Sequence, residues 1–375
     1  MFQTSWLRLI GAAFIVLAFA LSLAAQTPPQ ASPTPPDDDE PVRVTVEEIR
    51  LNVMARNEFD HFDPTLIPDD LMVVEDKIPH SVVSVRRLPA KVLLVLDMGG
   101  EMRAAKNLST TQAAAANIVN SLDAEDSIAV LQYSDKPEIL SEWSNKEAAL
   151  ETIARKLSFG RRSSFVAAMN LAAQFLNRGD LQNRHLVLIT DGLDGAADKK
   201  DRAAAVQKLL GANVSVHVLS YAGVELQKAV KRSVISGADG RVPVRTDSTH
   251  KASLPQPTQD LMNMPRIGMT INTDREMIRH ARKHQESLRE SQRQLNELAA
   301  QTGGAFISPE SNEQLIAKGK EIAEAIDSNY VATYIPKRPL ADSKPGETRE
   351  VGIVSRRVGL RVQARRVFIV PNRNN

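Results

Sequence analysis

The stretch KVLLVLDMGGE, residues 91–101, decides the fold that we predict for this chain. Five of the six residues from Val92 to Asp97 are apolar, and a continuous Val/Leu run bounded by glycine indicates a strand buried on both faces. The strand ends on the carboxylate of Asp97, and two glycines and a helical pattern follow. Open α/β sheets bind ligands at the carboxyl ends of their strands. The stretch therefore predicts a binding site at Asp97.

Further buried strands are predicted at residues 127–133, 185–190 and 214–219, with helical patterns between them. Strands that alternate with helices at this spacing specify a parallel sheet covered by helices on both faces. We therefore expect a doubly wound, Rossmann-like α/β domain over residues 88–328.

Two segments of this domain depart from the regular pattern. Residues 222–273 are rich in Pro, Met, Ser and Thr and are too long for an ordinary connection, so we interpret them as an insertion or a partner-binding loop. Residues 275–301 are highly charged with a thin apolar stripe, which favours a solvated surface helix.

Short alternating apolar segments flank the α/β domain on both sides, at residues 42–87 and 329–370. Alternation with period two, broken by turn formers, is typical of antiparallel strands. Because the pattern is the same on both sides, we expect the two flanks to pair into one β-rich domain.

The composition excludes several classes of site. The chain of 375 residues has 47 basic and 45 acidic side chains, a near balance that implies no nucleic-acid partner. It contains no cysteine, which excludes disulfides, thiol nucleophiles and Cys-ligated metals. A metal would have to bind through oxygen or histidine.

The first residues indicate export. Residues 1–25 combine a basic start, an apolar run and a small-residue end, which predicts a secretory signal peptide. The apolar run also approaches membrane-spanning length, so an uncleaved N-terminal anchor is the alternative. Residues 26–41 form a Pro-rich, acidic linker. A secreted, periplasmic or envelope location follows.

A second acid, Asp191, falls just beyond the strand at residues 185–190, and a hydroxyl turn at Ser163 and Ser164 begins a helix. Oxygen ligands that converge at strand ends suit Mg²⁺ or a similar cation. Carboxylates also cap helix N-termini. The pattern leaves both interpretations open.

Three ordered segments carry a family resemblance: VLLVLDMGGEM, SFGRRSSFVAAMNLA and HLVLITDGLDG. They resemble the successive motifs of a von Willebrand factor type A (VWA) domain. With the β flanks, the segment LAAQTGGAFI and a Tyr-x-x-x-Tyr strand, the chain is similar to secreted VWFA-related acidobacterial domain proteins over about residues 42–370. The resemblance implies a Rossmann-like fold that binds proteins, often through a metal-ion-dependent adhesion site.

The resemblance also implies a ligand set for that site: an Asp-x-Ser-x-Ser motif, a Thr and a second Asp. Asp97 and Asp191 match the two acids, and Ser163 stands where the Thr is expected. Gly99 and Glu101 stand at the positions of the two serines. We therefore expect a degenerate site for Mg²⁺ or Mn²⁺ formed by Asp97, Glu101, Ser163 and Asp191.

These features favour a non-enzymatic adhesion or protein-interaction protein with an unidentified protein partner. The alternatives are a hydrolase or phosphotransferase that uses Asp97, or a structural envelope component. Against the phosphotransferase, the second acid usual two residues after the nucleophile is replaced by Gly99.

Overall fold

The strand predicted from the opening stretch lies in the middle of a parallel sheet. The computed structural model describes residues 47–100, 106–179, 181–195, 197–227 and 275–371. In it, strand β4 (Lys91–Asp97) pairs in parallel with a neighbour on each side, and every residue from Val92 to Asp97 is buried. A strand surrounded in this way must be apolar on both faces, which is why its sequence shows no alternation.

The sheet has six strands in the order β6-β5-β4-β7-β8-β9. All neighbouring pairs are parallel except the edge strand β6, which pairs antiparallel with β5. The strands other than β4 are β5 (Ser127–Tyr133), β6 (Pro137–Ser144), β7 (Arg184–Thr190), β8 (Ser215–Ser220) and β9 (Phe306–Ile307).

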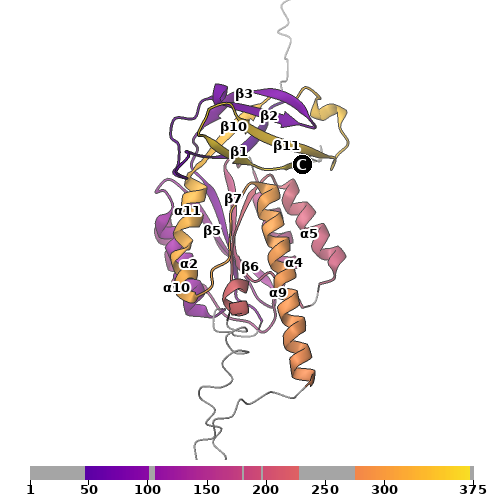
Figure 1. Cartoon of the computed structure of the whole chain (residues 1–375). Coiled ribbons are helices and arrows are strands. Elements are labelled where there is room, and N and C mark those ends of the chain that lie inside the picture. The colour runs from indigo at the N-terminus through magenta and orange to yellow at the C-terminus, as the bar shows by residue number, and fades with distance from the viewer. Residues whose placement is uncertain (1–46, 101–105, 180, 196, 228–274, 372–375) are drawn as a thin grey trace, which may run out of the picture. The chain divides into compact units, whose positions relative to one another are not determined.

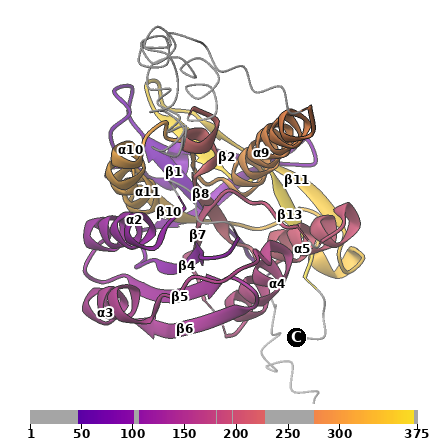
Figure 2. The same ribbon diagram turned by 90° about the horizontal axis from the view of Figure 1, so that it is seen from below.

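Helices cover both faces of this sheet (Figure 2). One face packs Leu94 and Leu96 against α2 (Leu108–Ser121), α3 (Lys146–Lys156), α10 (Asn312–Ala317) and α11 (Gly319–Asp327). The other packs Leu93 and Val95 against α4 (Phe165–Leu176), α5 (Lys199–Gly211) and α9 (Arg275–Thr302). The prediction of a doubly wound α/β domain is confirmed.

Helix α9 differs from the solvated surface helix expected for residues 275–301. Its later turns bury Leu288, Leu295 and Leu298, and the last two belong to the core on the α4 and α5 face of the sheet. A thin stripe suffices because its few leucines sit at helical spacing on the side that faces β8. The expectation of a merely solvated helix is therefore wrong for this half of α9.

The flanks of the chain form a second, antiparallel sheet, labelled near the top of Figure 1. Its order is β12-β1-β10-β3-β2-β11-β13, so strands from before and after the α/β domain interleave. This confirms the β-rich domain predicted from the two flanks. The strands are β1 (Ile49–Arg56), β2 (Leu71–Glu75), β3 (Ile78–Arg86), β10 (Asn329–Tyr334), β11 (Thr348–Ser355), β12 (Arg361–Ala364) and β13 (Val367–Ile369); two short 3-10 helices, η1 (Pro68–Asp70) and η2 (Leu340–Asp342), lie in the connections.

The antiparallel sheet contacts the amino ends of the parallel strands. The Asn52 side chain of β1 donates to the carbonyl of Arg184, where β7 begins, and to the Ser215 hydroxyl, where β8 begins. The buried guanidinium of Arg365 donates to the Leu210 carbonyl at the end of α5. These contacts are at the ends of the parallel strands opposite to Asp97, which is the last residue of β4.

Several predicted segments lie outside the described residues: the signal segment 1–25, the linker 26–41 and most of the insertion 222–273. The domain boundaries drawn from the sequence stay predictions. Within the described residues, no helix is both long and apolar enough to cross a membrane.

A buried ion pair links the two flanks. The side chain of Arg349 on β11 is fully buried, and its Nη1 lies 2.6 Å from Oε1 of Glu75 on β2. The same guanidinium donates to the carbonyls of Arg338 and Pro339 at 3.1 and 3.2 Å. If this guanidinium were removed, the buried carboxylate of Glu75 would lose its counter-ion, which costs free energy of folding.

We therefore expect Arg349→Ala to lower the free energy of unfolding by about 3–5 kcal/mol, because Glu75 would remain buried without its counter-ion. Urea unfolding at pH 7 measures the loss. The matched control is Arg361→Ala on β12, whose side chain is exposed, with an expected change within about 0.5 kcal/mol. Equal losses in the two variants would contradict the role assigned to Arg349.

A cluster of acids lies where α11 ends. Burial raises the pKa of the Asp327 carboxyl to about 7, and the neighbouring carboxylates of Asp123 and Asp126 act in the same direction, whereas Arg87 opposes them. Because the pKa in the folded state lies above the ordinary value of 3.8, the ionised carboxyl lowers stability at pH values above 7. That penalty shrinks as the pH falls from 7 toward 3.8, and it is absent at lower pH, where the carboxyl is protonated in both the folded and the unfolded state.

Asp327→Asn should therefore raise the free energy of unfolding at pH 8 by about 1 kcal/mol, after allowance for solvent screening of a partly exposed group. The gain should shrink as the pH falls below 7 and almost vanish by about pH 4, where the wild-type carboxyl is protonated in the folded state and largely protonated in the unfolded state as well. Urea unfolding at both pH values tests this, with the exposed Asp342→Asn as the control. A gain that persists at the lower pH would contradict the assignment.

Candidate functional site

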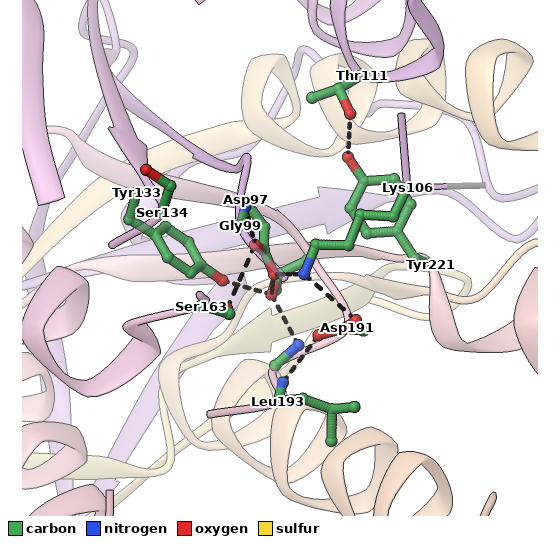
Figure 3. A network of polar contacts seen from close by, with 12 residues as sticks. Asp97, Gly99, Lys106, Thr111, Tyr133, Ser134, Ser163, Asp191, Leu193 and Tyr221 are labelled. Atoms are coloured by element: carbon green, nitrogen blue, oxygen red, sulfur yellow. Dashed lines mark hydrogen bonds and ion pairs between the residues drawn. The ribbon is translucent and has the colours of Figure 1, made fainter. Parts of the chain in front are cut away.

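The carboxylate of Asp97 is fully buried at the carboxyl end of β4 and has four partners within the protein (Figure 3). Its Oδ1 accepts from the Gly99 backbone N–H at 3.2 Å and from the Ser163 hydroxyl at 3.3 Å. Its Oδ2 accepts from the Thr190 hydroxyl at 3.1 Å and lies 2.7 Å from the Nζ of Lys106. Each oxygen of this buried carboxylate thus has hydrogen-bond or ion-pair partners within the protein.

Two hydrogen bonds between side chains connect Asp97 to Thr190 and Thr190 to Tyr133 within the sheet. Because the Thr190 hydroxyl donates to Asp97, it accepts the proton of the Tyr133 hydroxyl, whose oxygen lies 2.6 Å away. Burial, together with the charge of Asp97, raises the pKa of Tyr133 well above its usual value. The phenol therefore stays protonated and orients Thr190 toward the carboxylate.

The second acid, Asp191, directly follows β7 and is held by a turn. Its Oδ1 accepts from the Leu193 backbone N–H at 2.9 Å, and its backbone carbonyl accepts from the Ser291 hydroxyl of α9 at 2.7 Å. Gly192 has a φ of 67°, and an added Cβ would lie 2.5 Å from the Ser291 Oγ. Helix α9 thus packs directly on the turn that positions Asp191, and glycine is required there.

Lys106 joins the two acids. It immediately precedes Asn107, whose side chain caps α2 by accepting from the Thr110 N–H. From this position the lysine side chain, only 4% exposed, reaches inward, and its Nζ lies 2.7 Å from Asp97 Oδ2 and 3.4 Å from Asp191 Oδ2. Figure 3 shows the ammonium between the two carboxylates.

The surroundings keep Asp97 and Lys106 charged at neutral pH. Burial raises the pKa of Asp97 to about 6 even though the Lys106 ammonium opposes the shift. Burial would lower the pKa of Lys106, but the two carboxylates outweigh it and the pKa is raised. At pH 7 the charged ammonium of Lys106 is therefore paired with the ionised carboxylate of Asp97.

Gly99 lies in a crowded position. A Cβ built there would be 1.9 Å from the carbonyl oxygen of Arg162 and 2.8 Å from the Cα of Ser134. The loop that carries Ser163 therefore packs directly against the Gly99 backbone. A side chain at this position would require that loop to move.

The structure brings together three of the four residues predicted for the site, Asp97, Ser163 and Asp191. The fourth, Glu101, lies outside the described residues. Lys106, Thr190 and Tyr133 also belong to the site but were not predicted from the sequence. Thr190 and Tyr133 could have been found, since each is the last residue of a buried strand, whereas no periodicity or motif marks Lys106.

The residues present do not fit a divalent cation in this arrangement. Each of the four carboxylate oxygens of Asp97 and Asp191 already has a donor or an ion-pair partner. In the part of the chain that the structure describes, no three His, Cys, Asp or Glu residues come together as a metal-binding group. The expected ligand set for Mg²⁺ or Mn²⁺ stays a prediction from the sequence.

Comparison with known families supports the assignment of the fold. Residues 92–193, which run from β4 to the Asp191 turn, match the family model of the von Willebrand factor type A domain. This segment is a VWA domain. A search of curated proteins gives no match.

Solved structures similar to this chain include three VWA-type or related proteins. A von Willebrand factor type A protein from Catenulispora acidiphila has a TM-score of 0.40 and 10% identity, over 88% of this chain and 74% of its own. BatB from Bacteroides thetaiotaomicron has a TM-score of 0.37 and 16% identity, over 63% and 98%. The vWF domain of the type V pilus tip protein Mfa5 from Porphyromonas gingivalis has a TM-score of 0.26 and 17% identity, over 39% of this chain and 51% of its own.

The crowding at Gly99 predicts that the serine of the family motif cannot be restored in this VWA domain. Gly99→Ser should lower the free energy of unfolding by about 1–3 kcal/mol, because the new Cβ displaces the loop at Arg162. Gly195→Ser is the matched control, since a Cβ there meets no heavy atom within 4 Å. A Gly99→Ser variant as stable as the control would contradict the prediction, because it would show that the loop at Arg162 moves at little cost in free energy.

Proposed function

We propose that this protein is a secreted or envelope-exposed, non-enzymatic protein-interaction or adhesion protein. Its binding face is the carboxyl end of the parallel sheet in the VWA domain. The match of residues 92–193 to the VWA family carries the proposal, because such domains act as interaction modules. The partner is a protein whose identity the chain does not specify, and a structural role in the envelope would use the same face.

The burial of Asp97 supports a non-enzymatic role. A carboxylate that attacks a substrate must reach it, yet Asp97 is 0% exposed and both its oxygens are occupied. Among the residues that the structure describes, no histidine is a hydrogen-bond or ion-pair partner of Asp97 or Asp191. The two acids therefore fit a structural role beneath the face better than a chemical one on it.

Two exposed arginines beside the buried acids are suited to contact a partner. Arg161 and Arg162 are exposed in the loop between α3 and α4, next to Ser163. Their backbone N–H groups donate to the carboxylate of Asp135 at 3.3 and 3.1 Å, which fixes the loop to the end of β5. An ordered loop with exposed arginines loses little conformational entropy when it binds, and arginine is enriched in interfaces.

Site-specific photo-crosslinking in cells that export the protein tests the proposal. A photoreactive residue at position 161 should give discrete adducts with one or a few proteins. The control position is Glu125, which is exposed in the turn before β5, at the opposite end of that strand. Adducts that are absent at position 161, or the same at both positions, would contradict the assignment of this face.

A parallel assay addresses the enzymatic alternative. The purified protein should turn over no substrate of a panel of phosphoesters and carboxylic esters above the buffer blank. Turnover that Asp97→Asn abolishes would favour the hydrolase instead.

A further inference from the structure

Two carboxylates converge in the interior beneath the proposed binding face and need a positive charge between them. Asp97 is fully buried and Asp191 nearly so. Like charges at this depth repel strongly because the surroundings screen them poorly. A cation that both acids share is therefore a condition for this part of the fold.

The structure supplies that cation from the chain itself. The Nζ of Lys106 contacts Oδ2 of both acids and is buried with them. A divalent ion bound to the same two oxygens would sit at about 2.1 Å from each. It would then lie within contact distance of the ammonium, so the lysine and the ion compete for one position.

The remaining oxygens offer no second position for an ion. Oδ1 of Asp97 accepts from Gly99 and Ser163, and Oδ1 of Asp191 accepts from Leu193. The close approach of the Arg162 carbonyl to Gly99 leaves no room for an added hydroxyl ligand. Hard divalent ions need about six oxygen ligands, and the described residues do not provide them.

We propose that the Lys106 ammonium is the permanent cation of this site and takes the place of a divalent metal ion. The VWA domain is then complete without Mg²⁺ or Mn²⁺, and its binding face does not coordinate a carboxylate of the partner through a metal. This role of Lys106 is independent of which partner the face binds, and it extends the proposed function by fixing the site as metal-independent.

The first test uses the unmodified protein. Its melting temperature should differ by no more than about 1 °C between EDTA and 10 mM Mg²⁺, Mn²⁺ or Ca²⁺, because no site gains free energy from the ion. A saturable rise of several degrees with any of the three ions would overturn the proposal.

The second test removes the cation. Lys106→Met keeps the length of the apolar stem and deletes the charge, and it should lower the melting temperature by roughly 10 °C, since two buried anions lose their partner. The matched control is Lys136→Met, whose side chain is exposed just after β5. A Lys106→Met variant with the same melting temperature as the Lys136→Met control would overturn the proposal.

A double variant keeps the test decisive if Lys106→Met does not fold. Asp97→Asn combined with Lys106→Met removes one anion together with the cation, so it should melt several degrees above Lys106→Met alone, or restore a folding transition that the single variant lacks. Losses that simply add, so that the double variant is less stable than either single one, would overturn the proposal.

Discussion

The pairing of two buried acids with one buried lysine is the interaction on which the site depends. Parallel strands β4 and β7 are neighbours. The acid that ends β4 and the acid that follows β7 therefore lie close together at one edge of the sheet. Their mutual repulsion in a poorly screened interior would oppose folding unless a cation joined them. Lys106 meets this need at the start of α2, and it thereby ties that helix to the ends of two strands.

The surroundings of the site position these charges rather than react with them. Tyr133 and Thr190 orient one carboxylate, and Ser291 of α9 fixes the turn that carries the other. Such a fully bonded polar group is rigid because every member has its partner. The described loop at residues 161–163 is held by hydrogen bonds to Asp135 and Asp97, which suits recognition by surface complementarity.

The antiparallel sheet complements this arrangement at the other end of the strands. It interleaves strands from both flanks of the chain, and the buried pair of Arg349 and Glu75 joins a late strand to an early one. Contacts from Asn52 and Arg365 reach the amino ends of the parallel strands and the end of α5. The second sheet thus contacts the parallel strands at the ends opposite to Asp97, the last residue of β4.

The sequence by itself determined the strand at residues 91–97, the doubly wound α/β class, the pairing of the two flanks and the meeting of Asp97, Ser163 and Asp191. The strands, the fold class and the meeting of the two acids follow from local periodicity and from the rule that parallel strands end at one edge of a sheet, whereas the place of Ser163 is implied by the family resemblance. Only the tertiary structure decided what lies between the acids. The ammonium of Lys106 reaches that place through the path of its loop and the direction of its side chain, and neither leaves a pattern in the sequence. The burial of the α9 leucines was hidden for the same reason, because a thin apolar stripe becomes a core contact only when a sheet lies beneath it.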